Sequence, residues 1–180
     1  RDLSRSLRRI DWLIDALLKI SKIDAGTLEF RSERVSVAEL IRRAAAPLMI
    51  PMELRGQELG IHADSEEYTG DMQWSVEAIG NILKNCVEHT PEGGSIEISA
   101  AENALFTEIV ISDSGAGFEP GDIPHLFERF YRGKNADAAS VGIGLALART
   151  VIAAQNGTVA ASNGKNGGAQ FTVRFYKNIV

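Results

Sequence analysis

The sequence lacks the residues that small secreted proteins use to hold their folds together. It contains one cysteine, Cys86, among 180 residues. No disulfide can therefore form within the chain, and a reducing compartment is expected. We expect Cys86 itself to be a small, buried residue on a helix. The length suits one well-buried domain with an appendage and is too short for two large domains.

Long hydrophobic runs and an excess of positive charge are also missing. The longest apolar run, residues 44–52, contains proline and is far too short to span a bilayer, so we expect no membrane contact by this segment. Lys and Arg number 19 against 24 Asp and Glu, and the net charge of −5 argues against nucleic acid as the main partner. The charged start shows no signal peptide and no initial methionine, so we expect a fragment of a longer protein.

Residues 1–25 carry apolar side chains at alternating steps of four and three, the spacing of a helix that packs against other helices. These positions are Leu3, Leu7, Ile10, Ile14 and Leu17, and Leu13, Leu18, Ile20 and Ile23 widen the stripe, while Arg5, Arg8, Arg9 and Lys19 are available for a solvated side. A stripe this wide needs partner helices from another chain or from sequence outside this one. The alternative is a helix folded onto its own domain. Gly26 is expected to end the helix in a left-handed cap.

After Gly26 the pattern predicts interleaved strands and helices. Extended segments are expected at 28–37, 59–63, 67–70, 95–100, 105–111, 157–162 and 169–176, and helices at 37–55, 71–90 and 142–155. Ser36 and Glu39 form a capping-box pattern, Asp71 is a candidate N-cap, and Pro47 and Pro51 are expected to disturb the first of these helices. Hairpins mixed with helices predict an α+β fold with a mixed, mostly antiparallel sheet and helices on one face.

Two glycine motifs predict a nucleotide site. Residues 113–117, Asp-Ser-Gly-Ala-Gly, follow the apolar run 109–111, and Gly142 and Gly144 precede a helical pattern. Glycines allow close approach of a ligand to the backbone, and a helix N-terminus offers unpaired N–H groups to an anion. A plain turn would explain either motif alone. Together they suit a carboxylate for a base edge and a cradle for phosphates.

Polar residues on the predicted helix 71–90 point to a metal. Asn81 and Asn85 are four residues apart and share a face, with His89 one turn further on. Asparagine gains nothing in a helix interior, because its side chain competes with the backbone for hydrogen bonds. An amide oxygen is a suitable ligand for Mg²⁺ that bridges phosphates. The alternative is that both side chains are simply solvated.

With these features in place, the chain resembles the sensor histidine kinases. Their N box is similar to residues 81–91, the two glycine boxes to 113–117 and 142–147, the F box to 127–132, and the last glycine-rich hairpin to 167–171. Residues 14–26 resemble the end of the second helix of the dimerisation hairpin in that family. The resemblance thus divides the chain into residues 1–26, an incomplete dimerisation and phosphotransfer hairpin, and residues 27–180, a catalytic ATP-binding domain.

The resemblance implies a two-layer α/β sandwich, shared with gyrase-like and mismatch-repair ATPases, and assigns a role to each site residue. Asp113 would accept a hydrogen bond from the adenine amino group, which selects adenine because a carboxylate cannot donate. Asn85 would hold Mg²⁺, Asn81 would support the phosphates, His89 would lie beside the nucleotide, and Arg132 would reach the terminal phosphate. Further nucleotide contacts would come from Gly115, Gly117, Gly142, Gly144 and Leu145, beneath a lid formed by residues 132–141.

The implied activity is transfer of the γ-phosphate of Mg-ATP to a histidine, in the kinase core of a two-component system. The three histidines, His62, His89 and His125, lie outside the family's acidic acceptor motif, so the acceptor is expected to lie outside this chain. The family also implies a response-regulator receiver domain as partner, a homodimer formed through the N-terminal helix, and a cytoplasmic location within a membrane-anchored sensor.

Two departures from the family pattern leave alternatives open. Glu88 stands where the N box usually carries a lysine, and Ser140 stands where a glycine is common. A carboxylate turned inward would repel triphosphate, although Lys84 and Lys134 are candidates to compensate. The alternatives are therefore a nucleotide-gated binding module without kinase activity, or a serine kinase on the same fold. The heptad-like first helix argues against the serine kinase.

Overall fold

The computed structural model describes residues 2–133 and 142–178. The helices are α1 (Asp2–Asp24), α2 (Val37–Ala45), α3 (Met49–Leu54), α4 (Met72–His89) and α5 (Gly144–Ala154), with short 3-10 turns η1 (Ala46–Leu48) and η2 (Ile123–His125). The strands are β1 (Glu33–Ser36), β2 (Glu58–His62), β3 (Glu67–Gly70), β4 (Ser95–Glu102), β5 (Phe106–Asp113), β6 (Gly157–Asn163) and β7 (Ala169–Tyr176).

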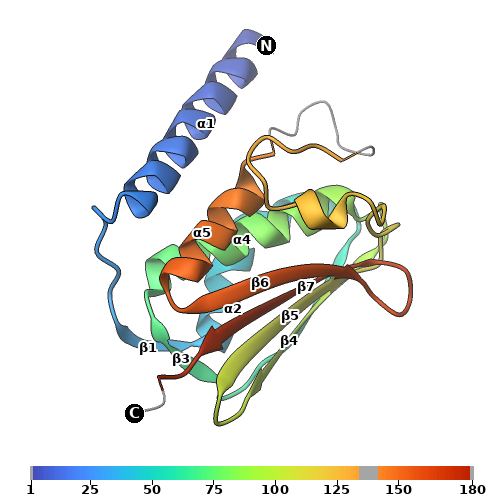
Figure 1. Cartoon of the computed structure of the whole chain (residues 1–180). Coiled ribbons are helices and arrows are strands. Elements are labelled where there is room, and N and C mark those ends of the chain that lie inside the picture. Colours follow the sequence, from blue (N-terminus) through green and yellow to red (C-terminus); the bar gives the residue numbers. More distant parts are fainter. Residues whose placement is uncertain (1, 134–141, 179–180) are drawn as a thin grey trace.

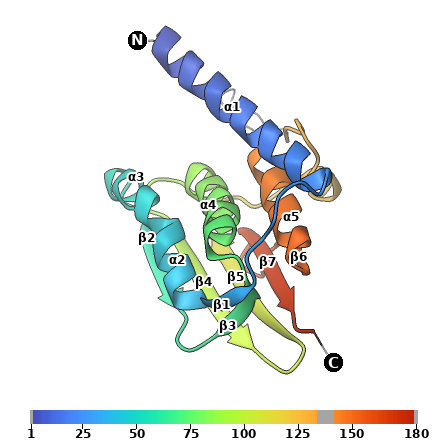
Figure 2. The ribbon, with the colours of Figure 1, turned by 90° about the vertical axis from the view of Figure 1, so that its left-hand side faces the viewer.

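Five strands form one sheet in the order β2-β4-β5-β7-β6. The β2–β4 pair is parallel and the other pairs are antiparallel. Strands β1 and β3 form a separate antiparallel pair. Helices α2, α4 and α5 lie side by side on one face of the large sheet, with α4 in the middle (Figure 1, Figure 2). The predicted two-layer α+β architecture with a mixed sheet is therefore confirmed.

The burial pattern of β5 also places a carboxylate at the C-terminal end of this central strand. Side chains alternate along β5, and every second one is buried: Thr107, Ile109, Ile111 and Asp113. This is the period of two that directs successive strand residues to opposite faces. Burying an isoleucine contributes about 1.5–3 kcal/mol, so Ile109 and Ile111 fix the register of the strand. The same alternation turns Asp113 toward the helical layer.

The N-cap predicted at Asp71 is present, and of the capping box predicted at Ser36 and Glu39 only the serine hydrogen bond is present. The Asp71 carboxylate accepts hydrogen bonds from the backbone N–H groups of Trp74 and Arg31 at 3.0 and 2.8 Å, which caps α4 and ties the linker after α1 to it. Ser36 Oγ accepts from the N–H of Glu39 at 3.3 Å and caps α2. The Glu39 carboxylate, however, binds Arg42 and Arg43 on its own helix.

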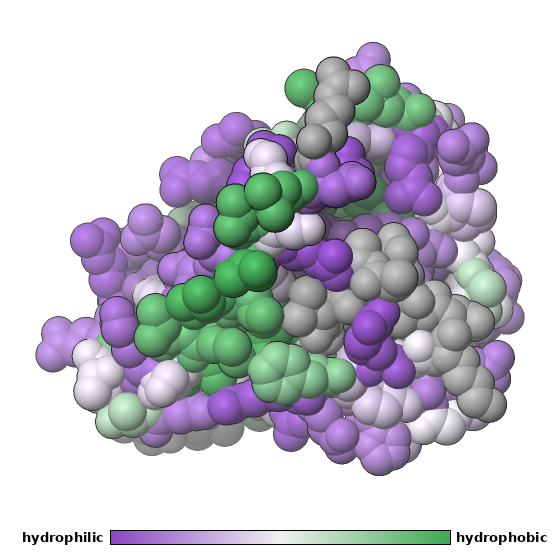
Figure 3. All heavy atoms as spheres, turned by 90° about the horizontal axis from the view of Figure 1, so that it is seen from above, coloured by the Kyte–Doolittle hydropathy of each residue, from purple (hydrophilic) through white to green (hydrophobic). Residues whose placement is uncertain are grey.

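Helix α1 divides its apolar residues between two faces. Ala16 and Ile20 are fully buried where the helix packs against α5. The other face is exposed and carries Leu3, Leu7, Ile10, Ile14 and Leu18. Figure 3 shows apolar side chains gathered along α1 on the upper face of the molecule. The helix is therefore folded onto its own domain with one face, and the partner helices expected for the other face stay a prediction.

Several details of the sequence analysis are corrected. The disturbance of helix 37–55 expected at Pro47 is confirmed by its division into α2, η1 and α3, because proline lacks the N–H that a continuous helix needs, whereas Pro51 lies inside α3. The predicted strand 28–37 is regular only in β1, and the helix expected from Gly142 begins at Gly144. Lys19 is half-buried instead of facing solvent fully, and its ammonium pairs with Asp15 and Glu77. Gly26 has φ +68°, as a left-handed cap requires.

The described helices were also compared with the length and hydropathy that a bilayer requires. None of those within residues 2–133 and 142–178 is long and apolar enough to cross a membrane.

Candidate functional site

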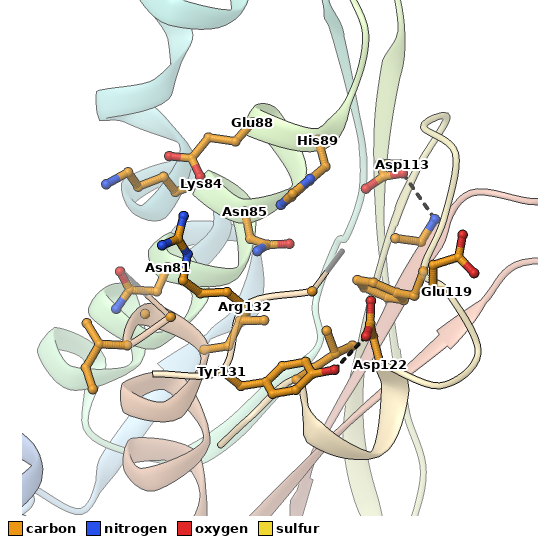
Figure 4. Close-up of a pocket in the computed structure, with 18 of the residues that line it drawn as sticks. Asn81, Lys84, Asn85, Glu88, His89, Asp113, Glu119, Asp122, Tyr131 and Arg132 are labelled. Carbon is orange, nitrogen blue, oxygen red and sulfur yellow. Dashed lines mark hydrogen bonds between the residues drawn. The ribbon is translucent and has the colours of Figure 1, made fainter. Parts of the chain in front are cut away.

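A cavity of about 590 Å³ opens beside α4, beneath the loop that follows β5 and at the N-terminus of α5 (Figure 4). Its walls hold nine of the ten predicted nucleotide-binding residues. These are Asn81, Asn85, His89, Asp113, Gly117, Arg132, Gly142, Gly144 and Leu145. Residues more than 60 positions apart in the sequence thus share one space. The motifs that together predict a nucleotide site therefore lie around a single cavity.

Asp113 lies at the buried end of this cavity with half of its carboxylate paired. Its Oδ1 accepts from the N–H groups of Gly115 and Ala169 at 2.9 and 3.1 Å. Its Oδ2 is buried and has no hydrogen-bond partner among the described residues. A buried acceptor left unpaired is costly, and such an atom in a cavity indicates a site for a donor from a ligand. An exocyclic amino group fits this requirement.

On the helical side, Asp113 faces the buried Cys86 of α4. Burial raises the pKa of the Cys86 thiol well above its usual value, and the negative charge of Asp113 raises that pKa further. The thiol therefore stays neutral and unreactive beneath the site. The expectation of a small, buried helical residue is confirmed.

Gly115 is the one predicted nucleotide-binding residue that does not line the cavity. Its N–H donates to Asp113 Oδ1, so its contribution to this site is to hold the carboxylate. Gly117 does line the cavity, with φ +77°, and a Cβ there would lie 2.4 Å from the carbonyl oxygen of Gly167. Only glycine can make this approach, which packs the first glycine box against the turn between β6 and β7.

The opposite end of the cavity is polar and belongs to α4. Asn81 and Asn85 are half-buried and share one face of the helix, with the exposed His89 at its end (Figure 4). A Cβ on Gly144 would lie 3.7 Å from Asn81 Oδ1, so the N-terminus of α5 meets this face. That terminus offers unpaired N–H groups to an anion.

The donors at this end suit a metal held partly by a ligand. Among the described residues, no group of three or more His, Cys, Asp or Glu side chains could hold a metal ion. Mg²⁺, however, is commonly bound through one or two protein oxygens together with substrate phosphates and water. The amide oxygens of Asn81 and Asn85 are compatible with that arrangement and not with a site built of protein ligands alone.

The acidic departure from the family pattern, Glu88, also lines the cavity. In Figure 4 its carboxylate lies on the same side as Lys84, away from Asp113. Lys84 in turn places its ammonium 5.2 Å from the centre of the Trp12 ring of α1, within the range of a cation–π contact. Glu88 is therefore at the rim beside a positive charge.

A hydrogen bond joins the two ends of the loop that lies at the cavity mouth. The N–H of Phe130 donates to the carbonyl of Gly142 at 2.9 Å, joining the F box to the second glycine box. The Tyr131 hydroxyl donates to Asp122 at 2.5 Å, which raises the pKa of Tyr131. Arg132 extends from the N-terminal end of this loop toward α4 (Figure 4). The rest of the predicted lid, with Lys134 and Ser140, lies outside the described residues.

Several cavity residues were not predicted from the sequence, among them Arg9, Trp12, Glu119, Asp122 and Tyr131. Tyr131 could have been found, because it lies inside the F box. Arg9 and Trp12 carry no such signal, since only the packing of α1 brings them to the site.

Comparison with known families shows the family to which the chain belongs. The family described as histidine kinase-, DNA gyrase B-, and HSP90-like ATPase matches residues 70–179. The chain belongs to this family. That match includes the N box, both glycine boxes and the F box, so this is an ATP-binding domain of the histidine-kinase type.

Individual relatives agree with the family. The signal transduction histidine-protein kinase BaeS of Escherichia coli K12 is 30% identical over 165 residues, which cover 89% of this chain and 35% of BaeS. Two solved structures share the fold at a TM-score of 0.77. Full-length ShkA in complex with AMPPNP is 21% identical over 93% of this chain and 36% of its own length. The histidine kinase ThkA, in complex with the response regulator TrrA, is 18% identical over 97% of this chain and 49% of its own length.

Proposed function

We propose that this chain binds Mg-ATP and transfers the γ-phosphate to a histidine on a dimerisation helix that it does not contain. The observation that carries the proposal is Asp113 Oδ2, a buried acceptor without a partner in a cavity shared with Asn81, Asn85 and the N-terminus of α5. An adenine amino group would satisfy the carboxylate, and the phosphates would then extend toward the amides.

The roles of the remaining residues follow from their places in the cavity. Asn85 would hold Mg²⁺ and Asn81 would support the phosphates, because both amides line the cavity and Asn81 lies near the start of α5. Arg132 would bind the terminal phosphate, where charge develops during transfer. Mg²⁺ would supply charge neutralisation between the phosphates when it is bound. His89 would lie beside the base, and the backbone of Gly117, Gly142, Gly144 and Leu145 would line the nucleotide.

The wider role is also a proposal, because the chain spans 35% of BaeS. We place a phosphotransfer helix fragment at residues 1–26 and the catalytic domain at residues 27–180. A response-regulator receiver domain is the proposed partner, as ThkA forms such a complex. The cytoplasmic part of a sensor kinase is the proposed location.

The test is binding followed by transfer. Calorimetry with AMPPNP and Mg²⁺ should give saturable 1:1 binding that weakens when EDTA removes the metal, whereas the guanine counterpart should bind at least tenfold more weakly. Labelled ATP should then phosphorylate a supplied dimerisation hairpin carrying the family's acceptor histidine. Equal binding of adenine and guanine nucleotides would refute the role of Asp113.

A second candidate is a nucleotide-gated binding module without transfer activity. The observation that favours it is Glu88, a carboxylate at the rim of the cavity where the family usually has a lysine. This candidate predicts normal AMPPNP binding and no label on the hairpin. Glu88→Lys should restore transfer if the carboxylate is the cause.

A further inference from the structure

One wall of the cavity comes from outside the region that matches the ATPase family. Arg9 and Trp12 of α1 line the same space as Asn81, Lys84 and Asn85, whereas the family match begins at residue 70. Neither the family nor the predicted site therefore assigns these two residues a role.

The wall lies at the polar end of the cavity. The Trp12 ring receives Lys84 at 5.2 Å, and Lys84 is adjacent in sequence to Asn85. Arg9 precedes Trp12 by three residues, so the two share a face of α1. In Figure 4, Lys84 and Asn81 lie on the side of the cavity opposite Asp113. Arg9 thus approaches the end where phosphates would lie and not the end suited to the base.

Contacts along the C-terminal half of α1 hold this arrangement. Lys19 pairs with Glu77 of α4 at 2.7 Å and lies 5.9 Å from the centre of the Trp74 ring. Asp24 forms an ion pair with Arg129 of the F box, and Ile20 is completely buried. Since a helix is rigid over three turns, these anchors fix where Arg9 lies.

The carboxylates that line the cavity favour an additional positive charge such as that of Arg9. Among the described residues, four carboxylates line it, from Glu88, Asp113, Glu119 and Asp122, and three cations oppose them, from Lys84, Arg132 and Arg9. A triphosphate brings further negative charge. The N box usually provides a lysine at the position of Glu88, so this cation is absent from α4.

We infer that Arg9 of α1 is a phosphate-binding residue of the nucleotide site and supplies the positive charge that the N box lacks. This inference rests on the proposed function, because it requires ATP in the cavity. Arginine suits the task, since its planar guanidinium can donate two hydrogen bonds to phosphate oxygens. Helix α1 would then take part in nucleotide binding as well as in packing.

The experiment compares Arg9→Ala with Arg8→Ala, which removes the same charge from the neighbouring residue of α1 that does not line the cavity. Calorimetry on the full chain should show about tenfold weaker binding of Mg-AMPPNP to Arg9→Ala, the scale of one lost contact to a charged group. Binding of AMP should change less than about twofold, and Arg9→Lys should recover part of the loss. Arg8→Ala should bind both ligands like the wild type.

Two outcomes separate the inference from the proposed function. If the wild-type chain binds Mg-AMPPNP and Arg9→Ala binds it equally well, or loses AMP and AMPPNP to the same degree, Arg9 does not bind phosphate. The proposed site would stand in that case. If the wild-type chain binds no adenine nucleotide at all, the proposed function fails and the inference fails with it.

Discussion

At the scale of single residues, the site depends on how a strand ends. The alternation that buries Ile109 and Ile111 also buries Asp113, where the sheet meets the cavity. The backbone N–H groups of Gly115 and Ala169 occupy one carboxylate oxygen and leave the other for a ligand. The proposed selection of adenine would thereby depend on main-chain hydrogen bonds as much as on the side chain itself.

Asp113→Asn should lose nucleotide affinity and keep the fold. The amide oxygen must take the place of Oδ1, because two N–H donors point there. The NH₂ group then replaces Oδ2 and faces the adenine amino group, donor against donor. We expect at least tenfold weaker Mg-AMPPNP binding by calorimetry, with an unchanged circular dichroism spectrum. Wild-type affinity in this variant would show that the base binds elsewhere.

The residue scale also shows what the sequence could foretell. Asp113 and Asn85 were predictable because each belongs to a local motif whose chemistry is unusual for its element. The hydrogen bond from the Gly115 N–H to the Asp113 carboxylate could not be read from the sequence, because it depends on the conformation of the loop. Arg9 and Trp12 could not be predicted, because their role depends on the direction in which α1 packs against the domain.

At the scale of elements, the helices and strands follow their local signals closely. N-caps at Ser36 and Asp71 and the proline at position 47 fix helix ends through neighbouring residues alone, so the sequence reveals them. The parallel pairing of β2 with β4 depends on distant contacts, and no local pattern announced it. The hydrogen bond from the Phe130 N–H to the Gly142 carbonyl likewise depends on contacts between residues that are distant in the sequence.

Gly142→Ala should disturb that hydrogen bond. The residue has φ +71°, and an added Cβ would lie 2.4 Å from the carbonyl oxygen of Tyr131. Left-handed backbone costs an alanine about 1–2 kcal/mol before the clash is counted. We expect a lower melting temperature and at least about fivefold weaker nucleotide binding. Gly121→Ala, where a Cβ meets nothing within 4 Å, is the control and should match the wild type in both measurements.

Helix α2 should lose stability at low pH through Glu39. Hydrogen bonds from Arg42 and Arg43 lower the pKa of this carboxyl to about 2. A group whose folded pKa is depressed stabilises the fold above its unfolded pKa of 4.5 and loses that effect as pH falls toward 2. Glu39→Gln should therefore melt below the wild type at pH 6, with the difference shrinking to nothing near pH 2. A difference independent of pH in thermal melts would contradict this account.

At the scale of the whole molecule, α1 joins the nucleotide site to a surface that the domain leaves open. One face of the helix packs on α5 and reaches the cavity, while the opposite face exposes Leu3, Leu7, Ile10, Ile14 and Leu18 (Figure 3). Apolar rows of this length on a projecting helix are typical of helix–helix interfaces. A partner on the outer face would be about one helix diameter, roughly 10 Å, from the end of the cavity proposed for the phosphates.

The exposed row should make the chain self-associate through α1. Ile10 is 51% exposed in the middle of the row, and a charge placed there would be buried in a helix–helix seam at high cost. We expect sedimentation equilibrium to show a concentration-dependent dimer for the wild type and a monomer for Ile10→Glu. Leu54→Glu, on the 82% exposed leucine of α3, adds the same charge away from α1 and should leave the dimer intact. A wild-type chain that stays monomeric at every concentration, or a dimer that only Leu54→Glu dissociates, would place the interface elsewhere than on α1.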